Sequence, residues 1–320
     1  MKKIAALALI LSLFLSACVK AQPKPDYTLV TRNGVTATQD YFDFFDASIH
    51  HEIIIEVTQV ALDELDSLMK IAYQKFGNFR ISAYVKANFV YKENGQEKMR
   101  INEVGLRTHG NIFSRYLIES DGFTMNSLHW RVSFDETFDL SEDSEAYKTR
   151  KKRNLFGLEN LVLKWNRTSL GTPFETDPYI LESYGYSLYE KAGIPSSKAS
   201  LVHVLFKVGG RTIDQGVMTM IEPVDDEFIQ KRFKKSDTKG DLIKALWQNA
   251  QANLESTTAN LFGVKDEEKG YTPAYDLKSN EEAKGEALKV LIRQISNTSI
   301  NELYDTLKLS IDLDNFNAFN

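Results

Sequence analysis

The sequence predicts an α+β protein, because segments with the two-residue period of strands and segments with the period of helices both occur along the chain. The clearest strand signal is an alternating stretch over residues 80–108, interrupted by the turn Glu93-Asn94-Gly95, which predicts a hairpin. The clearest helix signal covers residues 62–76, where apolar side chains recur at helical spacing until Gly77. Strands and helices are therefore both expected in one fold.

Three further elements follow from local patterns. Residues 51–58, HEIIIEVT, are rich in β-formers and predict a strand. Asp177 as N-cap and Pro178 in the first turn predict a helix that ends at Gly193. Its apolar stripe consists of Ile180, Leu181, Tyr184 and Leu188. Residues 202–222 predict a second hairpin with Gly209-Gly210 as its turn, and the face shared by alternate residues contains Val202, Val204, Phe206 and Val208.

The second hairpin ends in an acidic residue on an apolar face. Alternation places Glu222 on the same side as Met218 and Met220, and a lone buried carboxylate is costly, so a donor or cation is expected beside it. Asp225 is then expected to cap a short helix. By contrast, the basic run over residues 148–153, KTRKKR, is expected to be a solvated loop.

The N-terminus has the order of a secretory signal. Lys2 and Lys3 precede an apolar run over residues 4–15, and residues 15–18, LSAC, resemble a bacterial lipobox. Cys18 is the one cysteine in the chain, so no internal disulfide is available to it. We expect residues 1–17 to be removed, Cys18 to be lipidated, residues 18–26 to form a tether and residues 27–320 to fold outside the cytoplasm, attached to a membrane. The alternative is an ordinary signal peptide with a chance cysteine.

Composition and motifs exclude several classes of function. The formal net charge of −5 provides no general electrostatic reason to bind nucleic acid, which is not expected as a partner. The five histidines lack the spacing of metal ligands, so no metal site is expected. Neither the G-x-S-x-G motif of a serine hydrolase nor a G-x-G-x-x-G phosphate loop is present.

Seven motifs in a fixed order carry a resemblance to a known family. They are GLRTHGNIFSR, HWRVSFDETFD, LVLKWN, DPYILESYGYSLYEKAGIPSSKASLVHV, QGVMTMIEPVDDEFIQKRF, GDLIKALW and YTPAYDLKSN. Over about residues 100–320 the chain resembles the CotH family, named for a spore-coat protein and regarded as atypical secreted protein kinases. The resemblance implies an atypical protein-kinase-like fold with two lobes, which binds ATP and Mg²⁺ and phosphorylates serine or threonine, here in a secreted or envelope protein.

The resemblance also implies which residues contact the nucleotide. Arg107, Asn111, Ser114 and Arg115 fall where the family places a polar, arginine-bearing loop, and a triphosphate is a natural ligand for such a loop. His109 departs from the pattern, because many relatives have arginine there and a neutral histidine has one donor and no fixed charge. A purely structural loop with ion pairs is the alternative.

Three charged residues further along are additional candidates. Lys164 alternates away from the apolar face of its strand, so it is either a surface lysine or a phosphate ligand paired with an acid such as Glu222. Glu222 could instead lie in the segment that connects the lobes and receives the adenine. Lys244, in the GDLIKALW motif, is a third cation candidate.

The resemblance stops before two segments that matter for catalysis. Relatives continue, after a stretch like residues 311–319, into a catalytic Asp/Asn-rich segment and then a metal-binding segment, whereas this sequence ends at Asn320. We therefore expect an incomplete C-terminal lobe, no Mg²⁺ site and no phosphoryl transfer by this chain. Two alternatives stay open: a non-catalytic binding protein of the cell surface, and a structural coat or envelope component.

Overall fold

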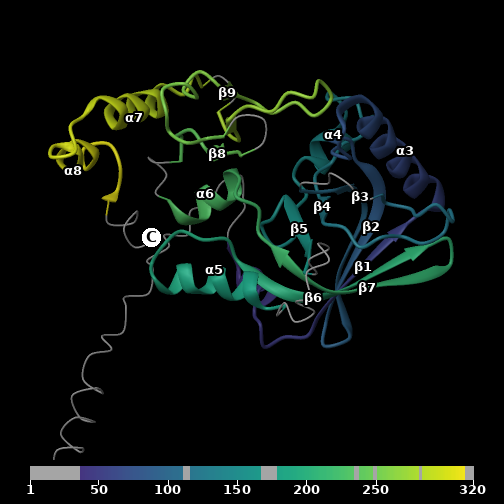
Figure 1. Ribbon diagram of the computed structural model, residues 1–320. Coiled ribbons are helices and arrows are strands. Elements are labelled where there is room, and N and C mark those ends of the chain that lie inside the picture. The colour runs from purple at the N-terminus through teal and green to yellow at the C-terminus, as the bar shows by residue number, and fades with distance from the viewer. Residues whose placement is uncertain are drawn as a thin grey trace, which may run out of the picture.

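The computed structural model describes residues 37–110, 116–166, 179–233, 238–247, 251–280 and 283–313. The predicted α+β class is confirmed: seven strands form a closed barrel in the order β1-β2-β3-β4-β5-β7-β6, and three short strands form a second sheet in the order β8-β10-β9 (Figure 1). No strand of the second sheet pairs with a barrel strand within the described part of the chain. Side-chain contacts and connecting segments must therefore hold the two sheets together.

The barrel is closed by a contact between distant segments. Its strands are β1 (His51–Val57), β2 (Val85–Glu93), β3 (Gln96–Thr108), β4 (Trp130–Ser133), β5 (Asn160–Trp165), β6 (Ala199–Val208) and β7 (Arg211–Ile221). Neighbouring strands run antiparallel except β1 and β6, which pair in parallel from Glu52–His203 to Val57–Val208 and close the barrel. Closure leaves no barrel edge free to pair with another chain.

Helices and the second sheet surround the barrel. The helices are α2 (Gln39–Phe44), α3 (Gln59–Phe76), α4 (Glu145–Arg150), α5 (Leu181–Lys191), α6 (Asp226–Arg232), α7 (Glu286–Asn297) and α8 (Leu303–Leu307). The second sheet consists of β8 (Ile243–Ala245), β9 (Phe262–Gly263) and β10 (Tyr275–Leu277). Among the described helices, none is long and apolar enough to cross a membrane.

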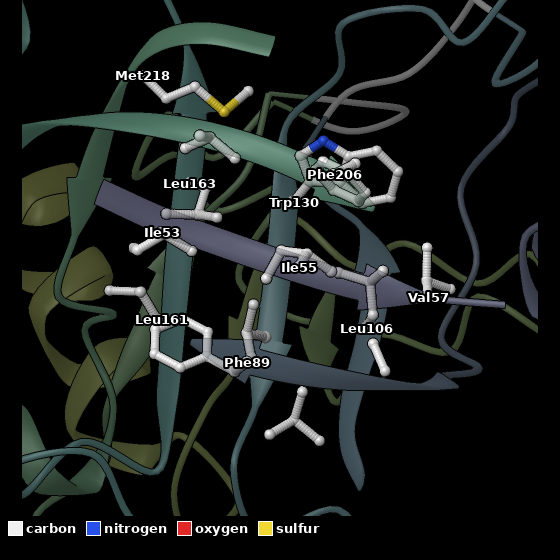
Figure 2. Packing of buried hydrophobic residues seen from close by; sticks show 14 of the residues in the cluster. Ile53, Ile55, Val57, Phe89, Leu106, Trp130, Leu161, Leu163, Phe206 and Met218 are labelled. Atoms are coloured by element: carbon white, nitrogen blue, oxygen red, sulfur yellow. The ribbon is translucent and has the colours of Figure 1, made fainter. Parts of the chain in front are cut away.

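The barrel interior is filled by alternate residues of its strands. Figure 2 shows side chains of Ile53, Ile55, Phe89, Trp130 and Phe206 gathered in one cluster, and each is fully buried. The ring centroids of Trp130 and Phe206 lie 4.8 Å apart. Burial of one such side chain contributes roughly 1.5–3 kcal/mol, so this cluster is the main source of stability for the barrel. The two-residue period then directs the intervening residues to the outer surface.

Both predicted hairpins are confirmed. Asn94 and Gly95 join β2 to β3 with φ of 50° and 82°, the left-handed pair that a two-residue hairpin turn requires. Gly209 and Gly210 join β6 to β7 with φ of 53° and 85°. The inward face of β6 is the predicted one.

The helix predicted over residues 62–76 is confirmed as α3, with an earlier start. Thr58 is the N-cap, and its hydroxyl accepts a hydrogen bond from the Ala61 amide at 3.1 Å. Gly77 ends the helix with φ of 70°, as its position predicted.

Helix α5 is present as predicted, but it starts later than predicted, and its apolar side faces solvent and not the protein core. Its N-cap is Ile180, so the prediction of Asp177 as N-cap is wrong; Asp177 itself lies outside the described residues. The predicted apolar stripe faces solvent, with Leu181 60% exposed. The helix is instead attached to the barrel through its charged side, where Glu182 pairs with Lys164 at 2.5 Å.

The prediction of a solvated loop over residues 148–153 is wrong. Part of this run forms α4, and Lys151 pairs with Asp135 at 2.8 Å. Arg153 donates to the backbone carbonyls of Asn102, Glu103 and Phe134 at 2.8–2.9 Å. Five donors on one guanidinium let a single arginine satisfy several carbonyls at once, and here it ties α4 to the barrel.

Candidate functional site

Basic side chains from three neighbouring strands share one patch on the outside of the barrel. Arg107 of β3 is the cross-strand partner of Arg131 of β4, and Lys164 of β5 lies on the outward side of its strand, opposite the buried Leu163. At the strand ends, the His109 amide donates to the His129 carbonyl at 2.8 Å. We call these residues, Arg107, His109, His129, Arg131 and Lys164, the basic face.

Arg107 is held in place by backbone carbonyls. Its Nη1 donates to Ile81 O at 3.2 Å and to Thr108 O at 3.0 Å, and its guanidinium lies 5.1 Å from the Tyr84 ring centroid. Its Nε is buried without a hydrogen-bond partner. No carboxylate forms an ion pair with Arg107 within the described residues, while residues 111–115 of the same loop lie outside them.

The Arg131 guanidinium is oriented by a hydrogen bond to a side-chain amide and not by an ion pair. Its Nε donates to Asn160 Oδ1 at 3.2 Å, and no carboxylate oxygen of a described residue lies within ion-pair distance. Two arginines directly opposite one another on adjacent strands repel. An anion bound between them would remove that repulsion, and a guanidinium fork matches two oxygens of a phosphate.

The pKa of His109 depends on the positive charges around it. Burial lowers its pKa most, and Arg131, Arg107, Lys244 and His129 lower the pKa further through like charge, so that it lies well below the usual value of 6.5. The imidazole is thus neutral at neutral pH. The same interactions place Lys244, far away in the sequence, beside the basic face.

The second sheet contributes lysines arranged around one buried carboxylate. Asp276 of β10 is 1% exposed, faces Lys244 of β8 across the sheet and pairs with Lys278. Its Oδ1 also accepts a hydrogen bond from the Lys265 amide at 3.0 Å. Partial burial lowers the pKa of Lys244, and the charges of Lys278, Lys265 and Arg131 lower that pKa further, whereas Asp276 raises it. Cations of the two sheets therefore interact with one another.

Some of the residues proposed for the site from the sequence lie in the described part of the chain. Arg107 and Lys244 are each near enough to His109 to lower its pKa, while Asn111, Ser114 and Arg115 lie outside the described residues. Arg131 was missed, although its motif was recognised. Alternation around Trp130 was the signal that could have placed Arg131 on the outer surface.

The proposed pairing of Lys164 with Glu222 is wrong. Lys164 points outward from β5 and pairs with Glu182 of α5 at 2.5 Å. Glu222 follows the inward residues Met218 and Met220 of β7 and is 1% exposed. The two side chains therefore leave the sheet on opposite sides.

The expectation that Glu222 needs a cation is confirmed with a different partner. Arg232 of α6 donates from Nη2 to Oε2 at 2.5 Å and from Nη1 to Oε1 at 3.2 Å. The Lys198 amide donates to Oε2 at 3.2 Å, and Lys231 Nζ lies 3.6 Å from Oε1. The side chains of Lys231 and Arg232 are both buried beside Glu222.

Three partly buried acids, Asp225, Glu227 and Glu159, form a group, and Asp225 interacts with Arg131. Burial raises the pKa of Asp225 and of Glu227 to about 7, and the negative charges of Glu227 and Glu159, respectively, raise each pKa further. The pKa of Glu159 is also raised, chiefly by burial. Asp225 caps α6 as predicted, accepting from the Phe228 amide at 3.3 Å. Within the described ranges, no three His, Cys, Asp or Glu side chains are arranged to hold a metal ion.

Comparison with known proteins agrees with the resemblance seen in the motifs. Residues 106–319 match the family model described as CotH kinase protein. No curated protein matches the chain. The matched span includes Arg107, Arg131, Lys164 and Lys244, so the basic face and the second sheet both lie within it.

Proposed function

Because the chain belongs to the CotH kinase protein family, we propose that its basic face binds the phosphate groups of a nucleoside triphosphate. The family description supplies the reaction class, the transfer of a phosphoryl group from a nucleotide such as ATP. Such sites consist mainly of fixed positive charges around the phosphates, because positioning and charge stabilisation account for most of the catalysis.

One observation carries this proposal: Arg107 and Arg131 lie side by side without a carboxylate partner in the described structure. Arg232, by contrast, has its charge paired with the carboxylate of Glu222. Here both guanidinium groups donate to neutral oxygens, and the acid whose charge Arg131 meets nearby is Asp225, with a pKa raised to about 7. Lys244 adds a third cation from the second sheet, so the phosphates would bind between the two sheets.

Lys164 and Glu182 support the same interpretation. Protein kinases use an ion pair between a strand lysine and a helix glutamate to hold the lysine on the α- and β-phosphates. Lys164 on β5 and Glu182 on α5 have this combination of residue types and elements, and their charged groups are 2.5 Å apart. We assign Lys164 that role with Glu182 as its partner. The barrel and the second sheet with α6–α8 would then correspond to the two kinase lobes.

Mg²⁺ is implied by the family, and within the described residues no group of three or more His, Cys, Asp or Glu side chains could hold it without the nucleotide. We therefore derive no step through a metal. Phosphate binding through Arg107, Arg131 and Lys244 needs no metal, so we propose that this chain binds nucleotide largely independently of Mg²⁺. Calorimetric titration of ATP with and without Mg²⁺ tests this proposal, and an affinity that depends strongly on Mg²⁺ would contradict it.

Calorimetric titration of ATP and of tripolyphosphate tests the proposed site. Arg131→Gln should weaken binding about 10- to 100-fold, because a charge-assisted hydrogen bond contributes roughly 1.5–3 kcal/mol. Arg107→Gln should act in the same direction, and Lys164→Gln should weaken ATP binding by a smaller factor. Arg100→Gln is the matched control, since Arg100 lies on the barrel surface and pairs with Glu56 and Glu97. Unchanged affinity in both the Arg107 and Arg131 variants would exclude the basic face as the phosphate site.

A further inference from the structure

An arm, residues 264–273, leaves the second sheet between β9 and β10 and is closed on itself by one β-bridge. Figure 1 shows this segment, in yellow-green, extending from β9 to α3. Asp266 and Tyr271 pair within it through two backbone hydrogen bonds of 3.0 and 2.8 Å, and the Asp266 carboxylate caps the turn by accepting from the Lys269 amide at 3.0 Å. The arm is therefore an ordered hairpin.

The tip of the arm docks on the C-terminal end of α3. Gly270 lies against the Phe76 ring so closely that a Cβ on this residue would be 2.6 Å from two ring carbons. Beside this contact, Lys75 Nζ donates to Glu268 O at 3.3 Å, and Ser82 Oγ donates to Glu268 Oε1 at 3.4 Å. The φ of Gly270 is +66°, which asparagine can also adopt, but a Cβ at this position would force the Phe76 ring to shift. Glycine at position 270 thus favours both the close contact and the conformation.

The base of the arm leads directly to the cations of the second sheet. Glu267 pairs with Lys265 and lies 3.8 Å from Nε of Arg80, which precedes β2. The Lys265 amide in turn donates to Asp276, the carboxylate that faces Lys244. A continuous series of contacts therefore runs from the α3 end of the barrel to the lysine beside the basic face.

We propose that the arm is a clasp that holds the second sheet at the basic face, with Gly270 and Glu267 as positioning residues for the anion site. The sheets share no strand pairing in the described structure, so contacts of this kind must set the separation between Lys244 and the pair Arg107 and Arg131. Cations that are already held at the correct spacing bind a polyphosphate more tightly, because less conformational entropy is lost on binding. The ligand in this inference rests on the proposed function, whereas the clasp itself does not.

The test compares Gly270→Ala with Gly122→Ala in the full chain kept in detergent. Both glycines have left-handed φ, +66° and +70°, but an added Cβ meets the Phe76 ring at position 270 and nothing within 4 Å at position 122. The control therefore reproduces the backbone strain without the collision. Gly270→Ala should speed hydrogen exchange of the amides in β8 and β10 and weaken tripolyphosphate binding about 10-fold. Gly122→Ala should do neither.

A charge-based variant separates positioning from simple electrostatics. Glu267→Gln removes a negative charge near the site, which by Coulomb attraction alone would strengthen anion binding. If Glu267 acts through the clasp, the variant should instead bind tripolyphosphate more weakly. The amides of β8 and β10 should also exchange hydrogen faster. Phe76→Ala, which removes the ring from the other side of the contact, should have the same two effects.

The outcomes are distinguishable from failure of the proposed function. The arm is not a clasp if the amides of β8 and β10 exchange hydrogen at the control's rate in all three variants, Gly270→Ala, Phe76→Ala and Glu267→Gln. If exchange in the second sheet rises but tripolyphosphate affinity is unchanged, the positioning role is wrong. If the wild-type chain binds no tripolyphosphate, the proposed function fails, while the exchange measurement still decides whether the arm holds the second sheet.

Discussion

Glu222 at the end of β7 and Arg232 in α6 form a two-point ion pair whose side chains are 1% and 4% exposed. The pair joins α6 to the barrel, and the Tyr41 hydroxyl of α2 accepts a further hydrogen bond from Arg232 at 3.4 Å. Three elements from distant parts of the sequence therefore meet at one carboxylate. Its effect on stability can be measured by removing one partner.

Arg232→Met should lower the free energy of unfolding by roughly 3–5 kcal/mol, because the Glu222 carboxylate would stay buried with its main partner removed. Urea denaturation measures the change. Arg100→Met, which breaks exposed pairs on the barrel surface, should lower it by less than about 1 kcal/mol. Equal losses in the two variants would show that burial does not set the importance of the Glu222 pair.

The partly buried acids Asp225 and Glu227 predict that stability falls as pH rises from about 4 to 7. The folded-state pKa values of Asp225 and Glu227 are about 7, above their unfolded values, so the folded state binds protons more tightly in this range. Each such proton changes the free energy of unfolding by up to about 1.4 kcal/mol per pH unit. Above pH 7 the ionised Asp225, Glu227 and Glu159 repel, with Arg131 and Lys231 as the facing cations.

Urea unfolding of Glu227→Gln at pH 5, 6, 7 and 8 checks this dependence. The variant should show a shallower loss of stability with pH than the wild type, since one titrating group is gone. Glu64→Gln, at an exposed position of α3, is the control and should keep the wild-type slope. A wild-type stability that rises between pH 5 and 7 would contradict the prediction.

His109 should take up a proton when phosphate binds. The positive charges around it and its burial hold its pKa well below 6.5, and a bound anion would offset those charges and raise the pKa. Calorimetry at pH 6 in two buffers of different ionisation enthalpy measures the uptake. His109→Gln should show less proton uptake than the wild type with tripolyphosphate. Identical uptake in both proteins would place the ligand away from His109.

The N-terminal motif predicts membrane attachment through Cys18, which lies outside the described residues. Cys18→Ala should release the protein from the membrane fraction, because the lipid would have no attachment site. Fractionation followed by immunoblotting measures the distribution. If the variant sediments with membranes as the wild type does, the lipoprotein prediction is wrong.

The sequence by itself determined the elements that depend on local periodicity and turn chemistry. Asn94-Gly95 specified a hairpin because few residues other than these adopt left-handed φ at low cost, and the inward face of β6 followed from the two-residue period. The need of Glu222 for a cation was also local, because a carboxylate on an apolar face cannot stay unpaired. The seven ordered motifs were sufficient for the family.

Only the tertiary structure decided which of these elements meet. Three relationships join residues far apart in the chain: the parallel pairing of β1 with β6, the ion pair of Lys164 with Glu182 in place of Glu222, and the effect of Lys244 on the pKa of His109. Period and propensity describe which side of a strand a residue occupies, but they do not specify the neighbouring strand. That neighbour is selected when the barrel closes around its core, because closure buries the apolar faces of all seven strands at once.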